Sequence, residues 1–289
     1  MTAAPGVVAA QVVPASAPSA SARTSVVREG SAYVLRAGGT EIRIDSSTGR
    51  LVRMARDGKT VSLQDGPRLV EGIATVTSVT QRSEGNDVIV EARYTGELQR
   101  VTWQLSPSGW LKLDYAYRMR GPHVYMGVTF DYPEPQVTGL RWLGRGPYRV
   151  YKNRLKGVEF DVFHKKYNDT QTGLSWNYPE FKGFHQDMYW ATLETTEAPI
   201  TFVFGSTDQF LRVLTPSEPT AAGSEPRNAH MVYPPGDISF LRGIAPIGTK
   251  FTTAAQQGPA GLPNIVGGHQ GVFQDTVWMY VGAVASLPE

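Results

Sequence analysis

Residues 101–117 read VTWQLSPSGWLKLDYAY, and this stretch decides the fold. Apolar residues occupy every second position from Val101 to Leu105, a turn follows at Pro107 to Gly109, and the alternation resumes from Leu111 to Tyr117. An apolar side chain at every second position is typical of a strand with one buried face. The stretch therefore predicts a β-hairpin.

The same period of two extends through most of the chain. Further predicted strands lie around residues 33–35, 42–44, 88–94, 124–130, 189–194, 200–204, 210–214 and 276–284. Turn signals separate these runs, and the 30 glycines and 20 prolines recur too often for a helix of three turns. We therefore predict an all-β fold of antiparallel twisted sheets packed face to face as a large sandwich.

Two kinds of segment depart from the strand pattern. Residues 1–30 are rich in Ala, Pro and Ser, which predicts a disordered linker followed by one domain over residues 31–289. No Lys or Arg precedes the apolar run from Val7 to Val13, so a signal peptide is a weaker interpretation. Residues 152–184 and 218–260 are predicted as long loops, where binding residues tend to gather.

Composition excludes several classes of function. The net charge is +2 without a block of Lys or Arg, which argues against nucleic acid or an anionic membrane as partner. The absence of Cys excludes disulfides, thiolate zinc sites and cysteine nucleophiles. His164 and His185 stand apart from each other, and no phosphate-binding loop is found, so we predict neither a metal nor a cofactor.

Aromatic and polar residues mix in two segments, residues 141–154 (RWLGRGPYRVYKNR) and 176–190 (WNYPEFKGFHQDMYW). Flat rings for sugar C–H faces, together with fixed hydrogen-bonding groups for hydroxyls, are what a carbohydrate site needs. The first segment is predicted as a sugar-facing loop. The predicted carbohydrate contacts here are Trp142, Arg145, Tyr148, Asn153, Arg154, Trp176, Tyr178, Glu180 and His185.

Residues of these two segments also have a purely structural interpretation. Arg145 can instead form an internal ion pair with Glu159, Asp161 or Glu180 that fixes the segment to the sheet. Trp190 is predicted to lie in the core.

Three segments carry a family resemblance: Glu41 to Leu51, Trp142 to Tyr148 with Tyr151 and Asn153-Arg154 downstream, and Gly236 to Phe251. Together they resemble the carboxy-terminal domain, or small chain, of family 2 glycoside hydrolases of the β-galactosidase type. The resemblance implies a β-supersandwich of the galactose-mutarotase type. It also implies that the two catalytic glutamates belong to a separate (β/α)₈ barrel, for which this chain lacks both length and pattern.

One departure concerns the sugar site of that family. Its sugar-stacking tryptophan precedes the segment that matches Ile238 to Gly248, where this chain has His230, Met231 and Tyr233. The resemblance implies Tyr233 as the substitute contact. It further implies an upstream catalytic domain or chain as partner, and a periplasmic or secreted location.

These observations predict a carbohydrate-binding or structural domain of a β-galactosidase-like hydrolase, without its own catalytic dyad. Its partner would be an oligo- or polysaccharide, including galactosides. One alternative is a carbohydrate-active enzyme of the epimerase or lyase type, for which an epimerase needs a histidine–carboxylate pair, with His164 and His185 and either Glu180 or Asp187 as the candidates. The candidate carboxylate pairs for a glycosidase-type reaction are Glu159 with Asp161 and Glu180 with Asp187. Another is an interface module that contacts no sugar.

Overall fold

The computed structural model describes residues 23–167, 181–216, 231–267 and 271–284. Within these ranges the chain consists of antiparallel strands joined by turns and a few short 3₁₀ segments, so the predicted all-β supersandwich is confirmed. None of the helices in the described ranges is long and apolar enough to cross a membrane.

The first sheet has five strands in sequence order. They are β1 (Thr24–Glu29), β2 (Ala32–Ala37), β3 (Thr40–Asp45), β4 (Leu51–Arg56) and β5 (Lys59–Val61). The predicted linker boundary is wrong at β1, which pairs with β2 from Thr24 opposite Ala37 to Glu29 opposite Ala32. The strand was missed because it is mostly exposed and buries too little to alternate clearly.

The second sheet has thirteen strands. Eleven follow the order β6 (Gln64–Leu69), β12 (Met126–Asp131), β18 (Ile238–Gly243), β17 (Phe210–Val213), β15 (Gly183–Thr195), β16 (Ile200–Phe204), β20 (Val272–Val281), β10 (Leu111–Arg118), β9 (Leu98–Leu105), β8 (Asp87–Gly96) and β7 (Ala74–Glu84). Strand β13 (Val137–Val150) pairs with β15 on one side and with β14 (Glu159–Lys166) on the other. A small separate pair joins β11 (Gly121–His123) to β19 (Asn264–Val266).

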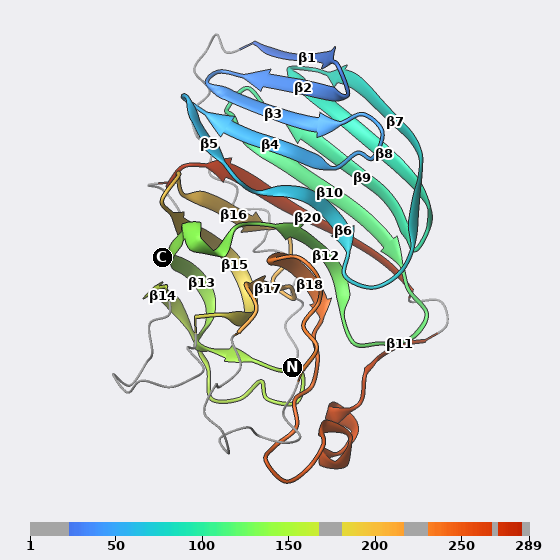
Figure 1. Cartoon of the computed structure of the whole chain (residues 1–289), viewed down its shortest axis with the longest axis vertical. Helices are drawn as coiled ribbons and strands as arrows, with labels where there is room; N and C mark the ends of the chain where they lie inside the picture. The colour runs from blue at the N-terminus through green and yellow to red at the C-terminus, as the bar shows by residue number, and fades with distance from the viewer. Residues whose placement is uncertain (1–22, 168–180, 217–230, 268–270, 285–289) are drawn as a thin grey trace, which may run out of the picture.

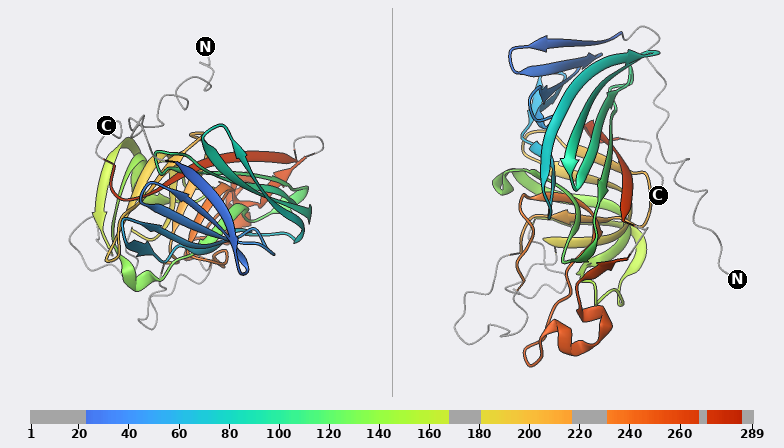
Figure 2. Two further views of the ribbon diagram at one scale, coloured as in Figure 1. Left: turned by 90° about the horizontal axis from the view of Figure 1, so that it is seen from above. Right: turned by 90° about the vertical axis from the view of Figure 1, so that its right-hand side faces the viewer.

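The five-stranded sheet lies face to face with the β7–β10 part of the large sheet (Figures 1 and 2). The indole Nε1 of Trp103 donates to the carbonyl of Gly49 over 2.9 Å, and the Tyr94 hydroxyl donates to the carbonyl of Thr48 over 2.7 Å. These bonds fix the turn after β3 above the large sheet. The largest apolar cluster continues beneath β12, β18, β16 and β13, and two smaller clusters contain further buried residues of the large sheet.

Two loop predictions are wrong in their extent. Residues 152–184 contain β14 and the start of β15, and residues 218–260 contain β18 and a 3₁₀ turn, Ala254–Gln257. The segment at residues 141–154 is mostly strand β13. Its alternation is hidden in the sequence because Trp142, Gly144 and Gly146 share the buried face, and two of these three positions carry no side chain.

Candidate functional site

The inner face of β13 belongs to the core, which corrects the prediction for Trp142. Its side chain is fully buried, and its Nε1 donates to the carbonyl of Arg145 over 3.2 Å. The ring centroid lies 5.3 Å from Phe163 and 4.8 Å from His185. A ring enclosed on both sides cannot stack on a sugar, so Trp142 contributes to packing.

The two glycines of β13 complete this packing. A Cβ at Gly146 would lie 2.7 Å from a ring carbon of Phe163 and 2.9 Å from a ring carbon of Trp142. A Cβ at Gly144 would lie 3.0 Å from the carbonyl oxygen of Asp187. The Trp-Leu-Gly-x-Gly-Pro motif therefore lets rings and a neighbouring strand approach the β13 backbone closely.

His185 is also buried, so its predicted contact with sugar is wrong. Its Nε2 donates to the carbonyl of Phe181 over 3.1 Å, while Nδ1 has no partner among the described residues. Burial lowers the pKa of His185 to about 4, so the ring is neutral at pH 7. The other candidate histidine, His164, is exposed and contacts Glu194 at 3.1 Å. The two histidines thus form no shared acid–base site among the described residues.

The outer face of β13 carries a charged and aromatic surface. The Nε of Arg145 donates to Oδ2 of Asp187 over 2.5 Å, so the internal ion pair predicted for Arg145 exists with a partner outside the predicted set. Phe160 is the cross-strand neighbour of Arg145, is 48% exposed, and meets Tyr189 edge to face at 5.2 Å. We call these four residues the Arg145 surface.

Three members of the Arg145 surface were not predicted from the sequence. Asp187 was predicted only as a partner for a histidine or for Glu180, and Tyr189 only as part of a strand. Phe160 carried a weak signal, because it alternates with Val162 and His164 on the outward face of one strand. Asp187 takes a left-handed conformation, with φ of 52°, that no local motif announces.

Two predicted contacts hold the chain together instead. Asn153 donates from Nδ2 to the carbonyl of Ile247 and accepts from the amide of Ile247 at Oδ1, each over 2.9 Å. Arg154 donates to the carbonyl of Gly248 over 2.8 Å. These bonds join two segments of the family resemblance. Tyr148 is 37% exposed and remains open to solvent.

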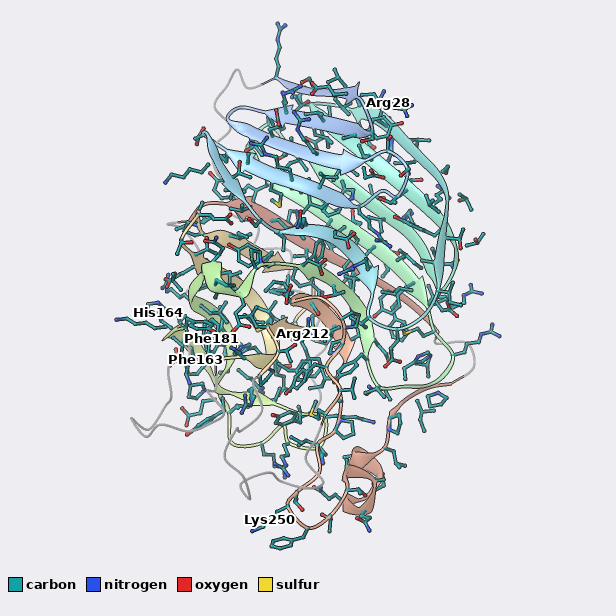
Figure 3. All side chains as sticks on the ribbon, viewed as in Figure 1. Arg28, Phe163, His164, Phe181, Arg212 and Lys250 are labelled. Carbon is teal, nitrogen blue, oxygen red and sulfur yellow. The ribbon has the colours of Figure 1, made fainter. Side chains whose placement is uncertain are left out.

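Tyr233 lies in a second apolar cluster, together with Val150, Phe184 and Tyr151. Its ring stacks on Phe184 at 5.5 Å with an interplanar angle of 17°, and burial raises the pKa of its hydroxyl far above the usual range. The guanidinium of Arg212 in β17, which is labelled in Figure 3, donates to the carbonyls of Pro234 and Pro235 and so fixes the backbone next to Tyr233. One face of the Tyr233 ring is thus taken up by Phe184.

The remaining predicted contacts, Trp176, Tyr178 and Glu180, lie outside the described residues. Glu159 and Asp161 are exposed on β14. Across the described ranges, no group of three or more His, Asp or Glu residues is placed to hold a metal ion.

Comparison with known proteins places these observations in a family. The family model of the beta galactosidase small chain matches residues 36–222, more than half of the 289 residues. No curated protein matches the sequence. Among solved structures, a galactose 1-epimerase from Lactobacillus acidophilus NCFM is 12% identical with a TM-score of 0.42, covering 91% of this chain and 100% of that chain. A provisionally assigned aldose 1-epimerase from Escherichia coli K12 is 12% identical with a TM-score of 0.41, covering 90% and 100%.

Proposed function

Because the chain belongs to the beta galactosidase small chain family, we propose that it contacts carbohydrate on behalf of a glycoside hydrolase. Hydrolysis itself is assigned to an upstream catalytic domain or chain, and the location to the periplasm or the cell exterior. The observation that carries the proposal is the Arg145 surface, where an exposed ring adjoins an ion pair on three neighbouring strands.

The chemistry of the Arg145 surface suits a sugar. The exposed Phe160 ring offers a flat face to the C–H side of a pyranose, and Tyr189 holds that ring from one edge. Arg145 and Asp187 supply donors and acceptors for neighbouring hydroxyls. Their mutual bond fixes both side chains before a ligand arrives, which lowers the entropy cost of binding.

The proposal is tested by calorimetric titration of the chain with galacto-, xylo- and pectic oligosaccharides. Phe160→Ala should weaken binding about fivefold, because a stacking ring contributes on the order of 1 kcal/mol. Phe251→Ala is the matched control, since Phe251 is 81% exposed and lies far along the chain in another segment. Equal affinity of the Phe160→Ala and Phe251→Ala variants would refute the role of the Arg145 surface.

A second candidate function is an interface module that contacts a partner domain and no sugar. It is favoured by large apolar side chains exposed between residues 231 and 266, namely Val232, Phe251, Leu262 and Ile265. Where such side chains form one contiguous patch, they often mark a protein contact. Absence of saturable binding to every oligosaccharide, in a folded sample, would make this candidate the better one.

A further inference from the structure

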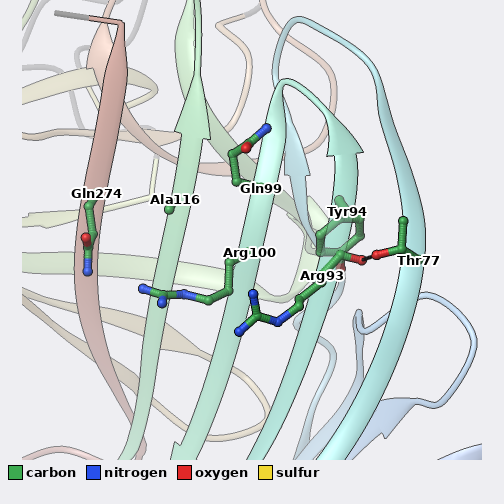
Figure 4. A pocket seen from close by; sticks show the side chains of 7 residues that line it. All are labelled: Thr77, Arg93, Tyr94, Gln99, Arg100, Ala116 and Gln274. Carbon is green, nitrogen blue, oxygen red and sulfur yellow. Dashed lines mark hydrogen bonds between the residues drawn. The ribbon is translucent and has the colours of Figure 1, made fainter.

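A groove lies on the outer face of the large sheet, away from the Arg145 surface. Arg93 on β8 lies opposite Arg100 on β9, Arg100 lies opposite Ala116 on β10, and Ala116 lies opposite Gln274 on β20. These four residues form one row across four strands (Figure 4). The row faces outward because the neighbours that alternate with it, such as Val101, are buried in the core.

The row is hollow at its centre. Ala116 is the one short side chain between Arg100 and Gln274, and the groove above it has a volume of about 450 Å³. Thr77, Gln99 and Tyr94 complete the lining, and none of its seven described residues is acidic. A small residue at this position leaves room for a ligand group rather than for packing.

The charges of the row are poorly satisfied by the protein. Two arginines directly opposite each other on adjacent strands repel, which destabilises a sheet. Arg93 is paired with Glu91 at 2.7 Å, but Arg100 forms no ion pair within the described residues. The Nε of Arg100 is buried and has no hydrogen-bond partner there. Buried unsatisfied donors are rare in folded proteins and call for a specific cause.

We propose that this groove binds the anionic group of an acidic oligosaccharide. The anion lies over Ala116, where the Arg100 guanidinium donates to it and Arg93, whose charge is balanced by Glu91, adds further N–H donors. The amide of Gln274 closes the other side of the site. The inference rests on the proposed carbohydrate function and gives it a second site and a class of sugar.

The adjacent row supports a sugar rather than a free anion. It contains Glu91, Thr102, Asp114 and Thr276, which lie opposite one another on the same four strands. Thr102 is buried, and Glu91 and Asp114 are 14% and 17% exposed and ion-paired with Arg93 and Lys112, so the two carboxylates keep oxygen lone pairs to accept from sugar hydroxyls. An acidic sugar can thus place its anion on the arginine row and its hydroxyls on the next row.

The test compares three probes by calorimetric titration: an oligogalacturonide, a sulfated galacto-oligosaccharide and a neutral galacto-oligosaccharide of equal length. Arg100→Gln removes the unpaired charge, and Ala116→Leu fills the groove without changing charge. Arg53→Gln is the matched control, because Arg53 is a partly exposed arginine on β4 of the other sheet. Circular dichroism verifies the fold of each variant.

We expect the acidic probes to bind more tightly than the neutral one, and both groove variants to weaken them about tenfold or more. The tighter of the two acidic probes identifies a carboxylate or a sulfate as the preferred anion. Equal losses in Arg100→Gln and Arg53→Gln would overturn the inference, since the attraction would then be a general effect of positive charge. Equal affinity for acidic and neutral probes would overturn it as well.

Each of the two proposed sites can be refuted without the other. If Phe160→Ala lowers the affinity for neutral galactosides while Arg100→Gln leaves the affinity for the acidic probes unchanged, the proposed function stands and the groove is rejected. If acidic probes depend on Arg100 and no probe responds to Phe160→Ala, the groove stands and the Arg145 surface is rejected.

Discussion

The buried imidazole of His185 makes the stability of this protein depend on pH in a calculable way. Burial among apolar groups lowers its pKa from 6.5 to about 4 in the folded state, while the unfolded chain keeps the ordinary value. The unfolded state therefore binds a proton first as the pH falls. Stability is complete above about pH 6.5 and is lost progressively as the pH falls from there toward 4.

The size of this effect follows from the two pKa values. At pH 5 the unfolded imidazole is almost fully protonated and the folded one is mostly neutral, which costs about 2 kcal/mol relative to pH 8. Below pH 4 the loss levels off at about 3 kcal/mol. In His185→Gln the amide still offers a donor to the Phe181 carbonyl but does not titrate. Its free energy of unfolding should therefore fall about 2 kcal/mol less between pH 8 and pH 5 than that of the unchanged protein.

The assay is urea unfolding followed by tryptophan fluorescence at several pH values and constant ionic strength. His164→Gln is the matched control, because it removes an exposed imidazole whose contact with Glu194 is worth about 0–1 kcal/mol. The comparison of the unchanged protein with His185→Gln cancels the contribution of the carboxylates, which are the same in both. Parallel curves for the unchanged protein and His185→Gln would refute the burial of a neutral imidazole beside Trp142.

Three more predictions concern the packing at Gly146, the buried charge of Asp275 and the hydrogen bonds of Asn153. All three are measured as free energies of unfolding in urea. Gly146→Ala should lose about 1–3 kcal/mol because its Cβ would overlap two rings, whereas Gly267→Ala, with nothing within 4 Å of its Cβ, should change stability by less than about 0.5 kcal/mol. Asp275→Asn should cost about 3 kcal/mol, since Asp275 is buried and accepts three bonds from the Arg242 guanidinium, and a loss below about 1 kcal/mol would contradict this. Asn153→Ala should cost about 1–2 kcal/mol and accelerate amide hydrogen exchange around Ile247, whose backbone Asn153 binds. Unchanged exchange would show that these two hydrogen bonds are not needed to hold that segment.

The strands that could be predicted from sequence are those with one fully apolar face. Residues 200–204 were predicted as a strand, and β16 spans these same residues. Val88 to Tyr94 alternates as predicted, with Val88, Val90 and Ala92 in the core. Trp190 is fully buried, as predicted. In each case a single apolar period of two was visible without knowledge of any other strand.

The candidate site was harder to predict because its residues are sorted by tertiary contacts. Within one segment, Trp142 faces inward, Arg145 faces outward, and Asn153 bonds to the backbone of a distant loop. All three have the chemistry of a sugar contact, and only the pairing of β13 with β14 and β15 separates them. Asp187 could not be identified from sequence as the ion-pair partner of Arg145, because the two residues are 42 positions apart and the pairing of β13 with β15 is irregular near Arg145.

Family membership and carbohydrate contact are therefore separate questions in this chain. The central motif encloses Trp142 and admits close backbone approach at Gly144 and Gly146, so packing alone accounts for these three residues. The motif identifies the fold, and a chain that kept the motif but bound no sugar would fold equally well. Evidence of binding must come from residues that packing does not require. Phe160 and Arg100 are two such residues, because the Phe160 ring is 48% exposed and Arg100 forms no ion pair within the described residues, where its Nε also has no hydrogen-bond partner. A loss of sugar affinity in either variant would thus report on function directly, whereas a loss at Trp142 would report mainly on folding.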